Sequence, residues 1–228
     1  MRFRDRAEAG QKLAGVLAPY RSGDVCVLGL ARGGLRVALE VARALEAPLD
    51  LWLARRVRVP GQRATLGAVA EGGGRYVDPQ AARQAQLSSD ALQRFVDAEA
   101  EDVEQQARQL RGGPTPQVRG RVVLLVDDGM VTGATAAAAL LALKTQDARQ
   151  RIVAVGVATP RALELSRSRA DAVHALTLSP SLREVSEAYE TFPALTQDEL
   201  RRWLTRAREG VPARALGVAP DVGGGWWF

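Results

Sequence analysis

Hydrophobic and polar positions repeat with two different periods in the first part of the chain. Apolar residues recur at helical spacing from Asp5 to Tyr20, and the aliphatic run from Val25 to Ala31 is typical of a buried strand. A second helical pattern from Leu35 to Leu45 precedes a second aliphatic run from Leu49 to Ala54. A strand, a helix and a strand in this order predict two neighbouring parallel strands joined by a right-handed crossover.

The pattern changes from Arg55 to Gly74, where a Pro-Gly pair, several arginines and a run of glycines indicate a mobile or hairpin-like loop. A short strand is expected within it, from Gly67 to Glu71. A polar stretch rich in Gln and Ala follows, with apolar residues at helical spacing from Ser88 to Leu110. We therefore expect a helical insertion over about 80–112, between strands of the sheet.

Strands and helices alternate again in the second half of the chain. An apolar run starts at Val122, a strand pattern runs from Arg151 to Ala158, a helix from Pro160 to Arg169, and another strand from Ala172 to Leu178. This alternation predicts an α/β fold with a parallel sheet and helices on both faces.

The alternation of strand and helix patterns ends after Ser179. A helix is expected from Gln197 to Arg208, and the Gly/Pro-rich residues 209–228 are expected to form a loosely attached tail. We therefore interpret residues 1–208 as one domain followed by a tail.

Composition narrows the class of protein. The 228 residues are 46% hydrophobic and 25% charged, as in ordinary globular proteins. The only cysteine, Cys26, excludes an intrachain disulfide framework, and the only histidine, His174, excludes a histidine-dependent triad or a multi-histidine metal site. No signal peptide and no apolar run long enough to span a bilayer are apparent, so we expect a cytoplasmic protein without a membrane partner.

The formal charge of +5 raises the question of a nucleic-acid partner. Only Lys12 and Lys144 among the 31 basic residues are lysines, and the arginines are spread along an alanine-rich chain. We interpret the charge as coding bias together with binding of an anionic small molecule, rather than as a nucleic-acid surface.

The stretch VVLLVDDGMVTGAT, from Val122 to Thr135, holds the strongest candidate chemistry. Asp127 and Asp128 end a buried strand, at the edge where open parallel sheets bind ligands. Backbone N–H groups of the Gly/Thr turn and the start of the next helix can bind a phosphate, with hydroxyls of Thr132 and Thr135 as further donors. The two carboxylates must then face neutral or cationic groups, such as sugar hydroxyls and a metal.

This stretch resembles the phosphoribosyl-pyrophosphate motif of type I phosphoribosyltransferases, most closely the bacterial predicted phosphoribosyltransferase group. ARGG, from Ala31 to Gly34, resembles the pyrophosphate loop of that family, and Arg55 and Arg56 lie where these enzymes place a basic contact to pyrophosphate. The resemblance implies a type I phosphoribosyltransferase core, with a small hood formed by about 179–208 and the N-terminal helix.

The resemblance also implies roles for individual residues. Asp127 and Asp128 would hold the ribose hydroxyls and, with Arg56, act in catalysis. Magnesium would be held mainly through the ligand near these carboxylates, with no direct protein ligand assigned. The pyrophosphate would lie against Arg56 and the ARGG segment. The full set of donor-binding positions comprises Ala31, Arg32, Gly33, Gly34, Arg56, Asp127, Asp128, Gly129, Met130, Val131, Thr132, Gly133, Ala134 and Thr135.

The implied reaction transfers the 5-phosphoribosyl group from phosphoribosyl pyrophosphate to a nitrogen heterocycle, such as a nucleobase, and releases pyrophosphate. The 6-oxopurine enzymes of the family have Asp where this chain has Val131, which argues against a hypoxanthine or guanine acceptor. Tyr189 and Phe192 lie in the hood segment, where an aromatic ring could stack on the base, or where Phe192 could anchor the last helix to the core.

Two alternatives stay open at this point. The chain could be a non-catalytic regulator that senses phosphoribosyl pyrophosphate and binds nucleic acid through its arginines, or a general nucleotide-binding α/β protein. Neither a dinucleotide-binding Gly-x-Gly-x-x-Gly, a P-loop nor a hydrolase nucleophile elbow occurs in the sequence. The acceptor and the oligomeric state do not follow from the sequence.

Overall fold

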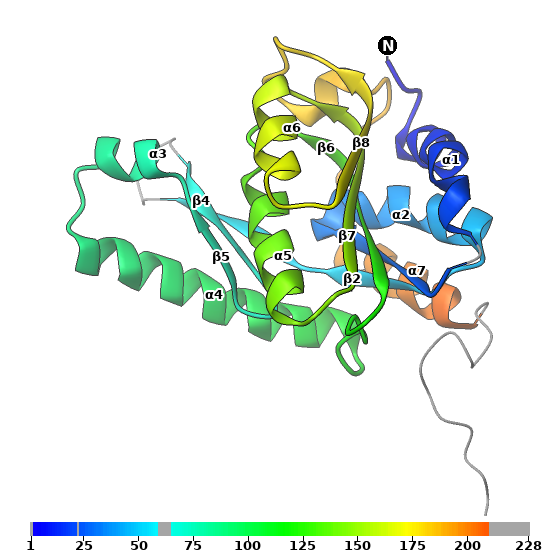
Figure 1. Cartoon of the computed structure of the whole chain (residues 1–228), viewed down its shortest axis with the longest axis horizontal. Helices are drawn as coiled ribbons and strands as arrows, with labels where there is room; N and C mark the ends of the chain where they lie inside the picture. The colour runs from blue at the N-terminus through cyan, green and yellow to red at the C-terminus, as the bar shows by residue number, and fades with distance from the viewer. Residues whose placement is uncertain (1, 22, 59–64, 210–228) are drawn as a thin grey trace, which may run out of the picture.

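The computed structural model describes residues 2–21, 23–58 and 65–209, and is built around a five-stranded parallel sheet (Figure 1). The strand order is β2-β1-β6-β7-β8. The chain runs outward from β1 to β2, and later outward from β6 to β8, so the direction of winding reverses between β1 and β6. In open parallel sheets the crevice at such a reversal point is the usual ligand site. The strands are β1 (Val25–Leu30), β2 (Leu49–Trp52), β6 (Val122–Met130), β7 (Gln150–Ala158) and β8 (Ala172–Leu178).

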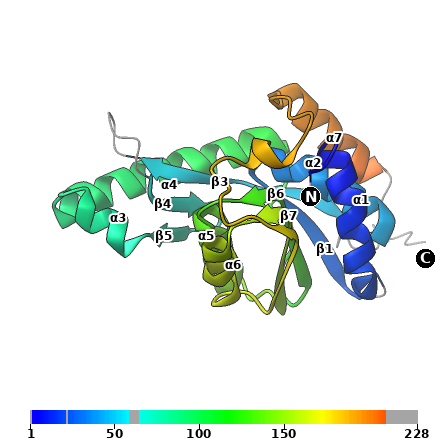
Figure 2. The ribbon, with the colours of Figure 1, turned by 90° about the horizontal axis from the view of Figure 1, so that it is seen from above.

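Helices cover both faces of the sheet, as the alternating pattern predicts (Figure 2). On one face lie α1 (Arg6–Leu17), α2 (Ala31–Leu45) and α7 (Gln197–Glu209). On the other lie α5 (Ala134–Thr145) and α6 (Pro160–Arg167). The expected α/β class with a parallel sheet is therefore confirmed.

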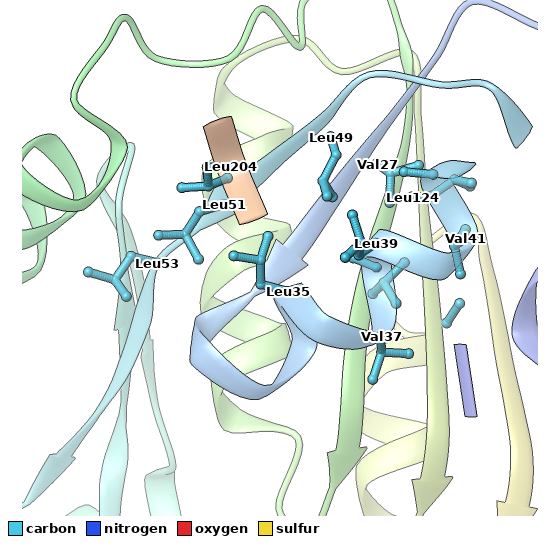
Figure 3. Packing of buried hydrophobic residues seen from close by; sticks show 14 of the residues in the cluster. Val27, Leu35, Val37, Leu39, Val41, Leu49, Leu51, Leu53, Leu124 and Leu204 are labelled. Carbon is cyan, nitrogen blue, oxygen red and sulfur yellow. The ribbon is translucent and has the colours of Figure 1, made fainter. Parts of the chain in front are cut away.

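The two faces are separated by the alternation of side chains along each strand. Val27 and Leu124 point toward α2, where they pack with Leu35 and Leu39 (Figure 3). Their chain neighbours Leu28 and Leu125 belong to the opposite cluster, with the alanines of α5. Because both faces are buried along β1, β6 and β7, these strands are largely apolar, which made them easy to predict, whereas the edge strand β8 is only partly buried.

A second, three-stranded antiparallel sheet replaces most of the loop expected at 55–74. It is made of β3 (Ala54–Arg58), β4 (Thr65–Ala70) and β5 (Gly74–Val77). The hairpin alternative for this region was thus the correct one, and β4 overlaps the predicted strand. The β4–β5 turn uses Gly72 and Gly73, whose φ angles of 77° and 80° favour glycine. Residues 59–64 lie outside the described residues.

Two helices follow this sheet over the range expected for the insertion: α3 (Pro79–Gln84) and α4 (Ser89–Arg111). The long α4 lies along β3 and β4 (Figure 1). Its N-cap is Ser88, which accepts a hydrogen bond from the N–H of Ala91 at 3.2 Å.

A buried ion-pair network fastens the end of α4 to both sheets. Arg111 donates to Glu71 at 2.6 Å, to Asp50 at 3.0 Å and to the carbonyl of Leu51 at 3.0 Å. Glu71 also accepts from the N–H of Leu53 at 2.6 Å. Burial raises the pKa of Glu71, and the guanidinium of Arg111 opposes that rise. The network lies beside the junction of β2 and β3, so it fixes where β3 leaves the main sheet.

The N-terminal segment pairs with the segment that leads to α7. The N–H of Phe3 donates to the carbonyl of Ala188, and the N–H of Glu190 donates to the carbonyl of Phe3, both at 2.8 Å. Short 3₁₀ turns, Ala18–Tyr20 and Val185–Ala188, complete the described elements. The predicted tail lies outside the described residues beyond 209.

We predict that Arg111→Met lowers the free energy of unfolding by about 3–5 kcal/mol, because it leaves the buried Glu71 carboxylate without the guanidinium that pairs with it. Urea unfolding would measure the change. Arg108→Met is the matched control, because Arg108 is exposed on the same helix and should shift stability by no more than about 0.5 kcal/mol. Equal effects of the two substitutions would contradict the prediction.

Candidate functional site

Asp127 and Asp128 lie at the carboxyl end of β6, next to the reversal point of the sheet. Their exposed fractions are only 8% and 7%. Oδ1 of Asp127 accepts the N–H of Asp128 at 2.9 Å. Burial, and then the neighbouring charge of Asp128, raise the pKa of Asp127 well above its ordinary value. The site therefore holds carboxylates in an arrangement that is unfavourable unless a cation or hydrogen-bond donors compensate it.

Arg6 supplies part of that compensation from the first turn of α1. Its Nε donates to Oδ2 of Asp128 at 2.8 Å, and both side chains are about nine-tenths buried. The hydroxyl of Tyr189 donates to the backbone carbonyl of Asp128 at 2.6 Å. Arg6 was not predicted from the sequence, since nothing local links it to a motif 122 positions away.

The two glycines of ARGG allow α2 to approach the carboxylates. A Cβ at Gly33 would overlap Oδ2 of Asp128 and lie 2.6 Å from its Cγ. A Cβ at Gly34 would overlap the carbonyl oxygen of Val126 and lie 2.9 Å from Oδ1 of Asp127. ARGG is not a loop, however: Ala31–Gly34 form the first turn of α2, which follows β1 directly. The glycine pair serves close packing and does not break the helix.

Two helices begin at the site without a side-chain N-cap. Leu30 precedes α2 and Gly133 precedes α5, and neither makes a side-chain cap hydrogen bond. At α5 a nearby hydroxyl, Oγ1 of Thr132, lies 3.4 Å from the N–H of Ala134. By contrast, side chains of Asp5, Asp78, Ser88 and Thr159 cap α1, α3, α4 and α6. The uncapped N–H groups and the helix dipoles leave a positive potential suited to an anion.

The turn between β6 and α5 is held from the neighbouring strand. Oγ1 of Thr159 donates to the carbonyl of Val131 at 2.7 Å, and the backbone N–H of Thr159 donates to the carbonyl of Met130 at 3.0 Å. Gly133 has a φ of 77°, and a Cβ there would lie 3.0 Å from the carbonyl of Ala162. The backbone of the turn is therefore fixed in one shape that only glycine suits.

These elements enclose a cavity of about 430 Å³. Among the positions predicted for the donor, Gly34 and Ala134 do not line it, and the side chain of Ala31 lies outside the described part of the chain. The others are brought together in its wall: Arg32, Gly33, Arg56, Asp127, Asp128, Gly129, Met130, Val131, Thr132, Gly133 and Thr135. Four further residues, which the sequence did not single out, complete the wall together with Arg55: Leu53, Ala54, Gln106 and Val185.

The two arginines of β3 differ in their surroundings. Arg55 donates to Glu99 of α4 at 2.6 Å and lies 3.6 Å from Asp102. Within the described part of the chain Arg56 has no acidic partner, and partial burial, together with the charge of Arg58, lowers its pKa. The guanidinium still carries a full charge at neutral pH. Arg56 is thus the cation of this pair that is available to a bound anion.

Tyr189 and Phe192 do not line the cavity. Tyr189 is 1% exposed, and its ring packs between Phe3 and Phe192, with centroid distances of 5.4 and 5.1 Å. The guanidinium of Arg6 lies 3.6 Å from the centre of the Phe192 ring. Both aromatics therefore support Asp128 and Arg6 from behind, and the structure gives neither a place for stacking on a base.

Residues 7–181 match the family model of the phosphoribosyl transferase domain, which covers the sheet, the carboxylate pair and the start of the hood segment. This chain belongs to the phosphoribosyl transferase domain family. The resemblance drawn from the motif between Val122 and Thr135 is thereby confirmed for the family.

Named relatives agree with that assignment. A crystal structure of TT1426 from Thermus thermophilus superposes with a TM-score of 0.75 and 39% identity, over 90% of this chain and 99% of that one. Two Mycobacterium tuberculosis proteins, from strains CDC 1551 / Oshkosh and H37Rv, are each named "Putative phosphoribosyl transferase" and are 34% identical over 222 residues. Those residues are 96% of this chain, which spans about half the length of these curated relatives.

Two kinds of feature are absent from the described residues. Across residues 2–21, 23–58 and 65–209, no helix is long and apolar enough to cross a membrane. The same residues contain no group of three or more His, Cys, Asp and Glu side chains that could hold a metal ion.

We predict that substitutions of the two carboxylates change stability in opposite directions. Asp127→Asn should raise the free energy of unfolding at pH 7 by roughly 1–2 kcal/mol, because it removes a buried charge that the fold disfavours. Asp128→Asn should lower it by about 2–3 kcal/mol, because Arg6 loses its counter-ion. Denaturant unfolding would measure both.

The gain in the free energy of unfolding that we expect for Asp127→Asn should also depend on pH. The folded pKa of Asp127 lies above its unfolded value of about 3.9. The wild type therefore loses stability as the pH rises from about 4 through the folded pKa, whereas the Asn variant does not. The difference between the two proteins should grow over that range, and a difference that does not change with pH would contradict this account.

Proposed function

We propose that this chain binds phosphoribosyl pyrophosphate in the cavity and transfers its phosphoribosyl group to a nitrogen heterocycle, releasing pyrophosphate. The observation that carries the proposal is the combination at one cavity of a buried carboxylate pair, two uncapped helix N-termini and Arg56. A donor with two separate phosphate groups and a hydroxylated sugar between them matches that distribution of charge.

The proposed pose follows from the charges. The 5′-phosphate would accept hydrogen bonds from the backbone N–H groups of the turn from Val131 to Thr135, at the start of α5. The ribose hydroxyls would donate to Asp127 and Asp128, which satisfies buried carboxylates without adding negative charge. The pyrophosphate would lie toward Arg32 and the start of α2, within reach of Arg56.

The chemistry would be a displacement at C1 of the ribose. The bond from C1 to the pyrophosphate oxygen breaks, and a lone pair of the acceptor nitrogen forms the new bond to C1. Positive charge develops on the ribose as the leaving group departs, and a carboxylate beside the sugar stabilises it. Arg56 and the α2 N-terminus stabilise the negative charge that develops on pyrophosphate.

The residues present fit a magnesium ion that is held mostly by the donor. Asp127 and Asp128 supply hard oxygen atoms, and burial, followed by the charge of Asp128, raises the pKa of Asp127. A cation bound beside the pair would offset both effects. When bound with the donor, magnesium would neutralise part of the pyrophosphate charge.

The acceptor would approach over Val131 and Val185, which form an apolar part of the cavity wall. A planar heterocycle fits such a wall, and Val131 offers no carboxylate to a purine nitrogen. A nitrogen heterocycle other than a 6-oxopurine is therefore the proposed acceptor class.

To test the donor site, phosphoribosyl pyrophosphate with magnesium would be titrated calorimetrically into the wild type and into Asp127→Asn/Asp128→Asn. Loss of two charged hydrogen-bond acceptors, at about 1.5–3 kcal/mol each, should weaken binding by at least about a hundredfold. Circular dichroism would show that the variant is folded. Equal affinities would exclude the carboxylates as the ribose site.

A second experiment would screen heterocycles for pyrophosphate release by the wild type. Release that depends on a heterocycle would establish the transferase. Donor binding without release, together with salt-dependent binding of nucleic acid, would instead favour a regulator that senses the donor.

The two arginines of β3 give a sharper test of the leaving-group site. Arg56→Ala should weaken binding of inorganic pyrophosphate roughly tenfold or more, because an available charged donor is lost. Arg55→Ala should weaken it by less than about threefold, because Glu99 and Asp102 already occupy Arg55. Calorimetry with pyrophosphate and magnesium would measure both. A larger loss for Arg55→Ala would show that Arg55 is the true contact.

A further inference from the structure

Arg6 occupies an unusual place for an arginine in the first turn of a surface helix. Only 8% of the residue is exposed, and its side chain reaches inward from α1 to the end of β6. Burying a guanidinium is costly unless every side of it is matched, so its partners indicate what it is for.

Three contacts fix the position of this guanidinium. Nε donates to Oδ2 of Asp128 at 2.8 Å, and Nη1 donates to the carbonyl of Pro193 at 2.8 Å. The Phe192 ring lies against it, with 3.6 Å between Cζ and the ring centre. Arg6 therefore joins the carboxylate pair to the segment before α7, which is remote from it in sequence.

These contacts also fix Asp128. Oδ2 lies between Arg6 and Gly33, at a place where no side chain at position 33 would fit. The backbone carbonyl of Asp128 is held by Tyr189. Asp128 lines the cavity, and its carboxylate also interacts with that of Asp127. Arg6 therefore clamps one oxygen of a carboxylate that lies in the cavity wall.

We propose that Arg6 is a positioning residue for the donor site: by clamping Oδ2 of Asp128, it holds this carboxylate in the cavity wall, in the orientation that accepts a ribose hydroxyl. This inference rests on the proposed function. It assigns to α1 and to the Phe192–Pro193 segment a part in ribose recognition that acts through Arg6, without contact between these elements and the donor. Tyr189 acts in the same assembly, by holding the backbone of Asp128.

A purely structural ion pair predicts a different result from a positioning pair. If Arg6 only stabilises the fold, its loss should affect every ligand of the folded protein alike. If Arg6 orients the carboxylate of Asp128, ligands that contain ribose should be affected and inorganic pyrophosphate should not, since pyrophosphate is proposed to bind at Arg56 and α2.

The experiment compares three ligands by calorimetry in the presence of magnesium: phosphoribosyl pyrophosphate, ribose 5-phosphate and inorganic pyrophosphate. Arg6→Gln should weaken the two ribose ligands about tenfold or more and leave pyrophosphate affinity within about twofold. Arg6→Lys keeps the charge and should recover part of the ribose affinity. It also provides a folded variant if Arg6→Gln is too unstable, with an expected loss of about three- to tenfold for ribose ligands alone.

Two matched controls separate the contacts of Arg6. Phe192→Leu removes the ring but keeps the contact with Asp128, so ribose affinity should fall less than in Arg6→Gln. Lys12→Gln removes a cation of α1 that pairs with Glu8 at the surface, at 2.8 Å, and should change no affinity.

The outcomes are distinct for the two proposals. A wild type that binds no phosphoribosyl pyrophosphate would overturn the proposed function and this inference together. A wild type that binds it, with Arg6→Gln and Arg6→Lys unchanged or with all three ligands weakened equally, would overturn the positioning role alone.

Discussion

Two carboxylates buried side by side repel each other, and most of the site can be understood as a response to that repulsion. Asp128 is matched by Arg6, while Asp127 has the N–H of Asp128 and a raised pKa. The glycines at the start of α2 let the N-terminal end of that helix approach the pair closely, and the helix dipole adds positive potential there. The negative charge that these groups do not compensate would be compensated by a bound ligand that brings hydroxyl donors or a cation. The carboxylate pair therefore makes the fold less stable than it could be, as is common where a fold keeps a binding function.

The cavity needs a second support, because its outer wall is not part of the main sheet. The strand β3, with Arg55 and Arg56, leaves that sheet directly after β2, and short antiparallel hairpins are only marginally stable by themselves. Arg111 and Glu71 fix this departure point from inside, and Glu99 of α4 holds Arg55 from outside. The helix α4 therefore has a role in the site beyond its own contribution of Gln106, since it determines where Arg56 is presented. An insertion that looks peripheral in the sequence thus positions the proposed leaving-group contact.

The sequence predicted what is encoded locally and missed what depends on distant contacts. The alternation of apolar runs identified every strand of the main sheet, because strands buried on both faces need continuous apolar residues. The motif from Val122 to Thr135 identified the carboxylate pair and the turn that follows it, because strand, turn and helix start lie next to each other in the chain. Arg6 and Arg111 were missed, because an arginine in a helix is ordinarily a surface residue. The Gly pair of ARGG was interpreted as a loop, since close packing against Asp127 and Asp128 cannot be seen in the sequence.

Departures from local rules are informative because of where they fall. Most helices of the described structure begin with a capping side chain, adjacent acids are normally solvated, and clustered arginines normally find acidic partners. The helices α2 and α5, the Asp127–Asp128 pair and Arg56 each depart from one of these rules, and all four meet at the same cavity. Independent defects would be scattered over the molecule. Their convergence at one cavity supports the proposed donor, which would supply what each lacks: phosphate oxygens for the helix starts and Arg56, and hydroxyl donors for the carboxylates.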